Sequence, residues 1–234
     1  MNRLFHIIRP LLIASAVILN TIATFGQNLS FYSLTTNEGL SHVKVNDIYS
    51  DEYGMMWIST DYGLNRYDGH SVEVFLNEKG VSGSIPHDKV TRITGDRNGH
   101  IWMVCPNRLV ELNLNTMKFQ TIYEGEVFAV NFDGDGGRLY ATVGHKILSM
   151  KPGETKLVET ADMGVPTYIE DLEISGNCIY AGTPDYGVWK LDLSNNSQEC
   201  LISSARMTRM YKDSKSAIWS GSWQNGLYRI GPDG

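Results

Sequence analysis

Helical patterning is missing from most of this chain of 234 residues. After residue 27, no segment repeats apolar residues at helical spacing, and no apolar run is long enough to cross a bilayer. Glycine is frequent, with 23 residues, and the strand-like runs are short and evenly spaced. The pattern excludes a helical bundle or a helical membrane domain beyond residue 27, and it predicts an all-β fold.

Signatures of catalysis and metal binding are lacking as well. There is no Gly-x-Ser-x-Gly elbow, no phosphate loop and no dinucleotide fingerprint. The histidines at 42, 70, 87, 100 and 145 have neither HExxH nor HxH spacing, and we interpret each as a solvated turn residue. We therefore predict that this chain is not an enzyme and that it holds no metal and no cofactor.

Acidic clusters have simpler interpretations than catalysis. Asp133 and Asp135 resemble the start of a calcium loop, but Gly144 stands where the bidentate acid is needed, which favours a hairpin turn. Paired acids around a central channel would indicate a glycosidase. The candidates, residues 170–171 and 124–126, fall at boundaries between repeats, so we interpret them as ordinary charged turn residues.

Three cysteines, at 105, 178 and 200, are few and odd in number. Cys178 and Cys200 are predicted on the second and fourth strands of one sheet, about 9–10 Å apart. A disulfide needs Cα atoms within about 7 Å. We predict small, buried free thiols.

The N-terminus has the features of a secretory signal peptide. Arg3 and Arg9 flank a basic start, residues 11–19 are apolar, and small residues precede position 27. Cleavage is predicted after residue 26, which places the remaining domain, 27–234, in the periplasm or outside the cell. Loss of two arginines changes the net charge from −6 to −8. This acidic domain is a poor partner for nucleic acid or an anionic membrane, and we predict no contact with either.

A repeat organises everything after the leader. Aromatic anchor residues recur at steps of 45, 38, 40 and 39 residues, which is blade spacing for a β-propeller. We interpret the repeat positions as structural, and they are Asp51, Gly54, Trp57, Thr60, Gly63, Asp96, Gly99, Trp102, Tyr140, Tyr180, Asp213, Trp219 and Gly226.

One repeat predicts a four-stranded antiparallel meander. In the first copy the strands are expected at 45–50, 55–60, 64–67 and 71–76, separated by turn residues. Five copies fit in the chain, and the fifth stops before its outer strand. Five blades with an unfinished last one should leave two blade faces uncovered and expose apolar surface.

Tryptophans divide into two groups. Trp57, Trp102 and Trp219 are anchors and are predicted to pack between adjacent blades. Trp189 and Trp223 lie off the repeat pattern, and they are weak candidates for ligand binding. Trp223 stands in a turn, where an exposed indole could stack on a sugar ring, although packing between blades is favoured for both.

The repeat resembles a known family. Gly39-Leu-Ser followed by Val45-x-x-Ile-x-x-Asp51-x-x-Gly54-x-x-Trp57-x-x-Thr60-x-x-Gly63-Leu-Asn-Arg-Tyr-Asp68 is similar to the regulator-propeller repeat of hybrid two-component sensors. The resemblance implies a periplasmic sensor of seven-bladed propellers that recognises an oligosaccharide and regulates glycan-utilisation genes. It also implies a second propeller and a homodimer partner in the full-length protein. No ligand-binding residue follows from it, because the repeat motif is structural.

Alternatives remain at this point. The five blades are interpreted as part of an incomplete seven-bladed propeller. Otherwise the chain is a self-contained five-bladed propeller in which residues 29–34 supply the missing outer strand. Such a module would bind carbohydrate or protein, and a propeller glycosidase or lyase is the least favoured reading. Kinase, receiver and DNA-binding segments are not among these residues.

Overall fold

The computed structural model describes residues 31–203 and 205–231. It divides into two units, Met1–Ser33 and Leu34–Gly234. The predicted signal peptide, residues 1–26, lies outside the described residues. Residues 31–34 form no strand, so the described part of the proposed closing strand is not formed. Among the described residues, no helix is long and apolar enough to cross a membrane.

The second unit is built from strands, after one short 3₁₀ helix, η1 (Thr36–Glu38). Nineteen strands within the described residues form five antiparallel sheets, and each sheet pairs its strands in chain order. The first sheet, blade 1, comprises β1 (Val45–Ser50), β2 (Met56–Thr60), β3 (Leu64–Tyr67) and β4 (Val72–Phe75). Blade 2 comprises β5 (Arg92–Gly95), β6 (His100–Cys105), β7 (Arg108–Asn113) and β8 (Lys118–Glu124).

Blades 3 and 4 repeat this meander. Blade 3 comprises β9 (Val130–Asp133), β10 (Arg138–Val143), β11 (Lys146–Met150) and β12 (Val158–Asp162). Blade 4 comprises β13 (Asp171–Ser175), β14 (Cys178–Thr183), β15 (Gly187–Asp192) and β16 (Ser197–Ile202). Blade 5 has three described strands, β17 (Met207–Lys212), β18 (Ile218–Ser222) and β19 (Gly226–Ile230). The prediction of five blades is confirmed, and the fifth has three strands among the described residues.

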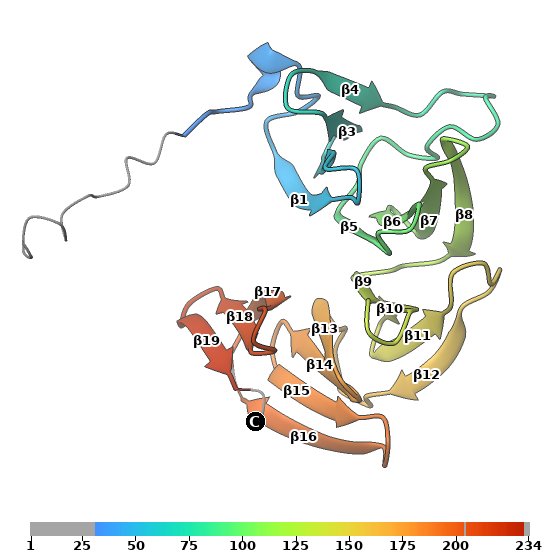
Figure 1. Cartoon of the computed structure of the whole chain (residues 1–234). Coiled ribbons are helices and arrows are strands. Elements are labelled where there is room, and N and C mark those ends of the chain that lie inside the picture. The colour runs from blue at the N-terminus through green and yellow to red at the C-terminus, as the bar shows by residue number, and fades with distance from the viewer. Residues whose placement is uncertain (1–30, 204, 232–234) are drawn as a thin grey trace, which may run out of the picture. The chain divides into compact units, whose positions relative to one another are not determined.

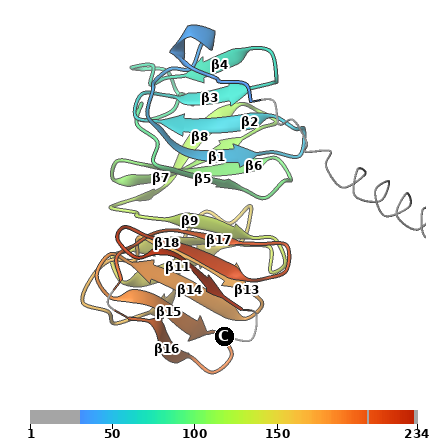
Figure 2. The same ribbon diagram turned by 90° about the vertical axis from the view of Figure 1, so that its left-hand side faces the viewer.

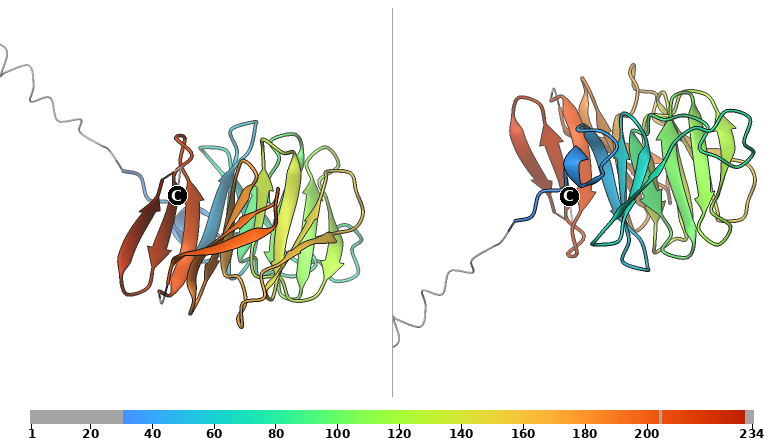
Figure 3. Two further views of the ribbon diagram at one scale, coloured as in Figure 1. Left: turned by 90° about the horizontal axis from the view of Figure 1, so that it is seen from below. Right: turned by 90° about the horizontal axis from the view of Figure 1, so that it is seen from above.

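The blades are arranged as in a β-propeller. The first strands of successive blades contact one another, from β1 to β5, β9, β13 and β17. Figure 1 shows these inner strands around the centre of the blades, with β4, β8, β12 and β16 on the outside. Figure 2 shows the sheets from the side, with blades 1 and 2 above blades 3, 4 and 5. Figure 3 shows strands running between two faces, at which the connections gather. The predicted all-β propeller fold is confirmed.

The repeated aspartate closes the turn between the first two strands of a blade. One carboxylate oxygen of Asp51 accepts hydrogen bonds from the backbone N–H groups of Tyr53 and Met55, both at 2.9 Å. The other oxygen accepts the indole N–H of Trp57 at 2.8 Å. In blade 5, Asp213 binds Lys215, Ala217 and Trp219 in the same pattern. The Asp-to-Trp spacing therefore joins a turn to the anchor side chain.

Blade 2 departs from this pattern. Asp96 accepts the same two backbone bonds, but its second oxygen contacts His100 Nδ1 at 2.8 Å. The buried indole N–H of Trp102 is left without a partner among the described residues. His100 is half-buried at the start of β6, so its interpretation as a solvated turn residue was wrong.

Four apolar clusters each fill one junction between adjacent blades. Trp57 packs toward blade 2 and Trp102 toward blade 3. Tyr140 packs toward blade 4 and Tyr180 toward blade 5. Each anchor side chain therefore faces the next blade, as predicted for Trp57 and Trp102. Trp219, the anchor of blade 5, is half-exposed, with Arg229 over its ring at 5.7 Å.

Polar bonds also cross each junction at the inner strands. Side-chain groups of one blade bind backbone groups of the next at five places, and these are Asp47 to Ile93, Thr94 to Phe132, Asn131 to Leu172, Asp171 to Met210, and Arg209 to Asn46. The last of these bonds joins blade 5 to blade 1 across 163 positions of sequence. We call this set the inner ring of bonds.

The junction between blades 5 and 1 differs from the others, because none of the four apolar clusters lies there. Arg209 bonds to the Asn46 carbonyl and lies 3.9 Å from the Asp47 carboxylate. On the flanking blade faces, Ile48 of blade 1 and both Tyr211 and Leu227 of blade 5 are exposed. The expected exposure of apolar surface on two blade faces is confirmed.

Replacing Asp51 by Ala should lower the free energy of unfolding by about 2–3 kcal/mol, because two turn bonds are lost and a buried indole N–H loses its partner. Urea denaturation measures the loss. Asp68→Ala is the matched control, since Asp68 also closes a turn but binds no buried indole. Its effect should be smaller, and equal losses would contradict this role of Asp51.

Replacing His100 by Ala should leave stability unchanged or increased, because the released Asp96 oxygen can accept the Trp102 indole N–H. The thermal midpoint measures this result. His145→Ala is the control, since it also removes a His–Asp contact, with Asp162, at an exposed site. A larger loss for His100→Ala than for the control would show that the histidine stabilises blade 2.

Candidate functional site

The two faces of the propeller carry different connections. The described links between blades lie with the loops between the second and third strands of each blade, and backbone bonds join the two sets. These links are residues 76–91, 125–129, 163–170 and 205–206. Examples are Gly125 N to Asn107 O at 2.9 Å and Trp223 N to Arg206 O at 3.0 Å. We call this the link face. The opposite face, formed by the tight turns, is the turn face.

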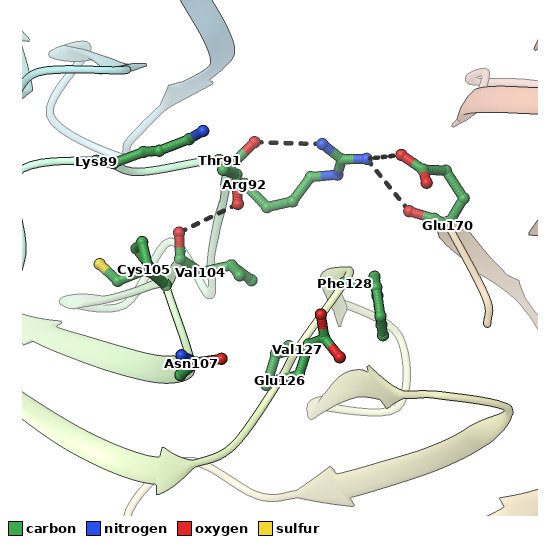
Figure 4. Close-up of a pocket in the computed structure, with 11 residues that line it drawn as sticks. Lys89, Thr91, Arg92, Val104, Cys105, Asn107, Glu126, Val127, Phe128 and Glu170 are labelled. Atoms are coloured by element: carbon green, nitrogen blue, oxygen red, sulfur yellow. Dashed lines mark hydrogen bonds and ion pairs between the residues drawn. The ribbon is translucent and has the colours of Figure 1, made fainter.

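A pocket of about 400 Å³ opens on the link face beside the inner strands of blades 2 and 4. Figure 4 shows its lining, which comes from the links before β5, β9 and β13 and from the β6–β7 loop. Lys89, Asn107 and Glu126 supply exposed polar groups, and Val127 and Phe128 supply apolar surface. This size and mixture are typical of small-ligand sites. We call it the mouth pocket.

Arg92 forms the wall between the mouth pocket and the channel. Its guanidinium donates to the Glu170 carboxylate at 3.0 Å and to the Glu170 carbonyl at 3.2 Å. The pair joins blade 2 to blade 4 across 78 positions of sequence. Arg92 Nε is buried without a partner among the described residues. Figure 4 shows this side chain stretched from β5 to Glu170.

A second cavity, of about 190 Å³, lies behind this wall among the inner strands. Arg92 lines both cavities, so the two share one side chain. The other charged residues that line the second cavity are Asp47, Asp171, Glu173 and Arg209. Three acids and two arginines therefore face a narrow space at the centre of the propeller.

Burial changes the acidity of this cluster. It raises the pKa of Asp171, against the guanidinium of Arg92 and a backbone bond from Met210. Burial, together with the charge of Asp171, raises the pKa of Glu173 to about 7. The pKa of Arg209 is lowered by burial and by the nearby Arg92. The two acids on β13 thus share an environment in which one proton near neutral pH relieves repulsion.

Several aromatic residues beyond the repeat anchors lie on the link face. Phe128 stacks on Tyr168 with ring centroids 4.2 Å apart. Trp223, with 73% of its surface exposed, lies under the guanidinium of Arg206 at 5.8 Å. Trp189 instead packs against the cluster between blades 3 and 4, and its indole donates to the Tyr186 carbonyl at 2.9 Å.

Several residues lie elsewhere than the sequence interpretation placed them. Asp171 begins β13 and lines the channel cavity, so its interpretation as an ordinary charged turn residue was wrong. Glu170 is held by Arg92, while Glu126 lines the mouth pocket. Asp133 does close the hairpin between β9 and β10, as predicted.

Sequence reasoning missed Arg92, Glu173 and Arg209. All three lie on inner strands, and the available signal was that the first strand of each blade carries charged residues at positions expected to face the channel. All three cysteines are free thiols, as predicted, but only Cys105 is buried, whereas Cys178 is half-buried and Cys200 is exposed, so the expected burial was wrong for these two. Among the described residues, no group of three or more His, Cys, Asp or Glu side chains could hold a metal ion.

Chemically, the arrangement supports binding. The mouth pocket offers an ammonium, an amide, a carboxylate and an aromatic face around one space. These groups can bind hydroxyl groups and an apolar ring face. Glu170 is engaged by Arg92, which leaves Glu126 as the accessible acid of the pocket.

Comparisons with known proteins agree with this geometry. The family model described as "Two component regulator propeller" matches residues 39–62. A histidine kinase P4 from Formosa agariphila is 41% identical over 58 residues, which is 25% of this chain and 4% of that protein. The matched residues contain the hydrogen bond between Asp51 and Trp57 and end directly before Gly63.

Solved structures share the fold. The extracellular domain of a putative hybrid two-component system from B. thetaiotaomicron has a TM-score of 0.74 at 20% identity, over 86% of this chain and 30% of that one. The extracellular domain of a putative one-component system from the same organism has a TM-score of 0.57 at 15% identity, over 83% of this chain and 33% of that one. The chain therefore spans about a third of the solved relatives and a small part of the curated one.

Replacing Glu173 by Gln should stabilise the protein at pH 8 by about 1–2 kcal/mol, after allowance for partial exposure. The folded pKa is above the unfolded value, so ionisation costs stability as pH rises from about 4.5 to about 7. The difference from wild type should vanish near pH 4. Urea denaturation across this range measures it, with Glu199→Gln on the exposed strand β16 as control. A pH-independent difference would contradict the shifted pKa.

Proposed function

We propose that this chain, which carries a two component regulator propeller repeat, is part of a sensor. The sensor binds an oligosaccharide at the mouth pocket and thereby regulates glycan-utilisation genes. The chain is a propeller domain of the two-component regulator type, which fits a non-catalytic role. The observation that carries the ligand proposal is the convergence of polar and aromatic side chains in one pocket on the link face.

The chemistry of the pocket supports a saccharide. The Asn107 amide can donate to hydroxyl groups and accept from them, and the Glu126 carboxylate can accept from them. The Phe128 ring can pack on the C–H face of a sugar. A nucleic-acid ligand is disfavoured by the net charge of −6, since phosphate backbones need a basic surface. The ligand class therefore follows from hydroxyl-binding groups beside an aromatic face.

The rest of the proposal concerns a longer protein. The relatives with similar domains are described as extracellular parts of putative one- or two-component systems. We propose that residues 1–26 direct export to the periplasm or cell exterior and that other segments transmit the signal. A second propeller and a homodimer partner belong to the same proposal, as does the absence of a membrane or nucleic-acid contact by this chain.

Thermal melts against a panel of neutral and anionic oligosaccharides test the ligand proposal. At least one saccharide should raise the melting midpoint, because a ligand that binds only the folded state stabilises it. Glu126→Ala and Asn107→Ala should each weaken binding about tenfold or more. Glu52→Ala, in the turn between β1 and β2 on the turn face, is the matched control. No shift with any saccharide would overturn the proposal.

A further inference from the structure

Exposed aromatic side chains are unequally shared between the two faces. On the link face they include Tyr62 in the β2–β3 loop, Tyr186 in the β14–β15 loop and Trp223 in the β18–β19 loop. On the turn face, Tyr53 is exposed among turns closed by polar side chains. Apolar surface gathered beside a pocket indicates a binding surface more than scattered packing does.

Two aromatic pairs stand on this face beyond the mouth pocket. In the first, Phe128 comes from the link before β9 and Tyr168 from the link before β13, and both rings are half-buried. In the second, Arg206 covers the ring of Trp223, and Trp223 N donates to the Arg206 carbonyl. We call these four residues the aromatic track.

The aromatic track is continuous with the mouth pocket. Phe128 lines that pocket and stacks on Tyr168, which extends the aromatic surface toward blade 4. Burial and the Glu170 carboxylate raise the pKa of Tyr168, while the guanidinium of Arg206 opposes them. Arg206 therefore lies within electrostatic range of Tyr168, and it leads to Trp223 in blade 5.

We propose that the aromatic track is a second subsite, on which successive rings of an extended saccharide chain stack while one end occupies the mouth pocket. This rests on the proposed function and goes beyond it, because it assigns a ligand longer than the pocket alone requires. Sugar rings present C–H faces that pack on aromatic rings, and hydroxyl groups at their edges that bind charged side chains. Arg206 and Asp185 supply such charges beside the rings.

A protein ligand fits this surface less well. The track joins one stacked pair of rings to the Trp223 ring through charged side chains. Protein interfaces centre instead on a contiguous apolar patch with a polar rim.

The aromatic track is tested with the purified chain and a series of oligosaccharides that contain two to eight sugar units. The series is prepared from whichever glycan in the panel shifts the melting midpoint. Calorimetry and tryptophan fluorescence measure affinity as a function of length. Wild type should bind longer members on the order of tenfold more tightly than the disaccharide, with a change in the emission of the exposed Trp223 indole.

Variants separate the track from the pocket. Trp223→Ala and Tyr168→Ala should lose the gain with length but keep the affinity for the disaccharide. Tyr168→Phe should behave as wild type, since it keeps the ring and loses only the hydroxyl. Tyr53→Ala on the turn face, which removes another exposed aromatic ring, should have no effect.

Each result has a definite meaning. If the disaccharide binds and affinity does not grow with length, the track is overturned while the proposed function stands. The same holds if the gain with length persists in Trp223→Ala and Tyr168→Ala. If no saccharide of any length binds, both the proposed function and the track are overturned.

Discussion

The inner ring of bonds holds the blades in register. Backbone ladders stabilise each sheet internally, but they do not continue from one blade to the next. Adjacent blades are joined mainly by apolar packing and by side-chain bonds to a neighbouring inner strand, such as Asp47 to Ile93 or Asp171 to Met210. A polar bond has a defined direction, whereas apolar contact does not. These bonds therefore fix how far each sheet is displaced along its neighbour, and so where the link-face loops meet.

The bond between blades 5 and 1 lies in a more charged environment than the other four inner bonds. Four junctions combine an apolar cluster with an inner bond, while Arg209 spans from blade 5 to blade 1 among acids and beside Arg92. The same charged groups line the channel cavity, and Arg92 also lines the mouth pocket. The candidate site is thus continuous with the interactions that set the blade arrangement. Arg92 and Glu170 therefore connect the mouth pocket to the charged groups at the blade junctions.

Local signals were reliable where local chemistry forms the structure. The strands predicted at 45–50 and 64–67 are β1 and β3 at the same bounds, because Asp51 and Gly63 set the turns through contacts only a few residues apart. The anchor spacing likewise gave the number of blades. His100 was interpreted wrongly because the side chains of His100 and Trp102 are both spaced to reach the same oxygen of Asp96. Sequence spacing alone does not decide which of the two binds it, and in the structure it is His100.

Repeat spacing, turn residues and alternation thus specified an all-β chain of five blades with an unfinished last sheet, since each depends on neighbours within about 40 residues. The channel and the pocket required the tertiary structure. Arg92 and Glu170 are 78 positions apart, and Arg209 and Asn46 are 163 apart. No periodicity relates such residues, because their contact arises only when the sheets are arranged around one axis. The repeat motif encodes the scaffold, and the site is made by residues that the motif leaves free to vary.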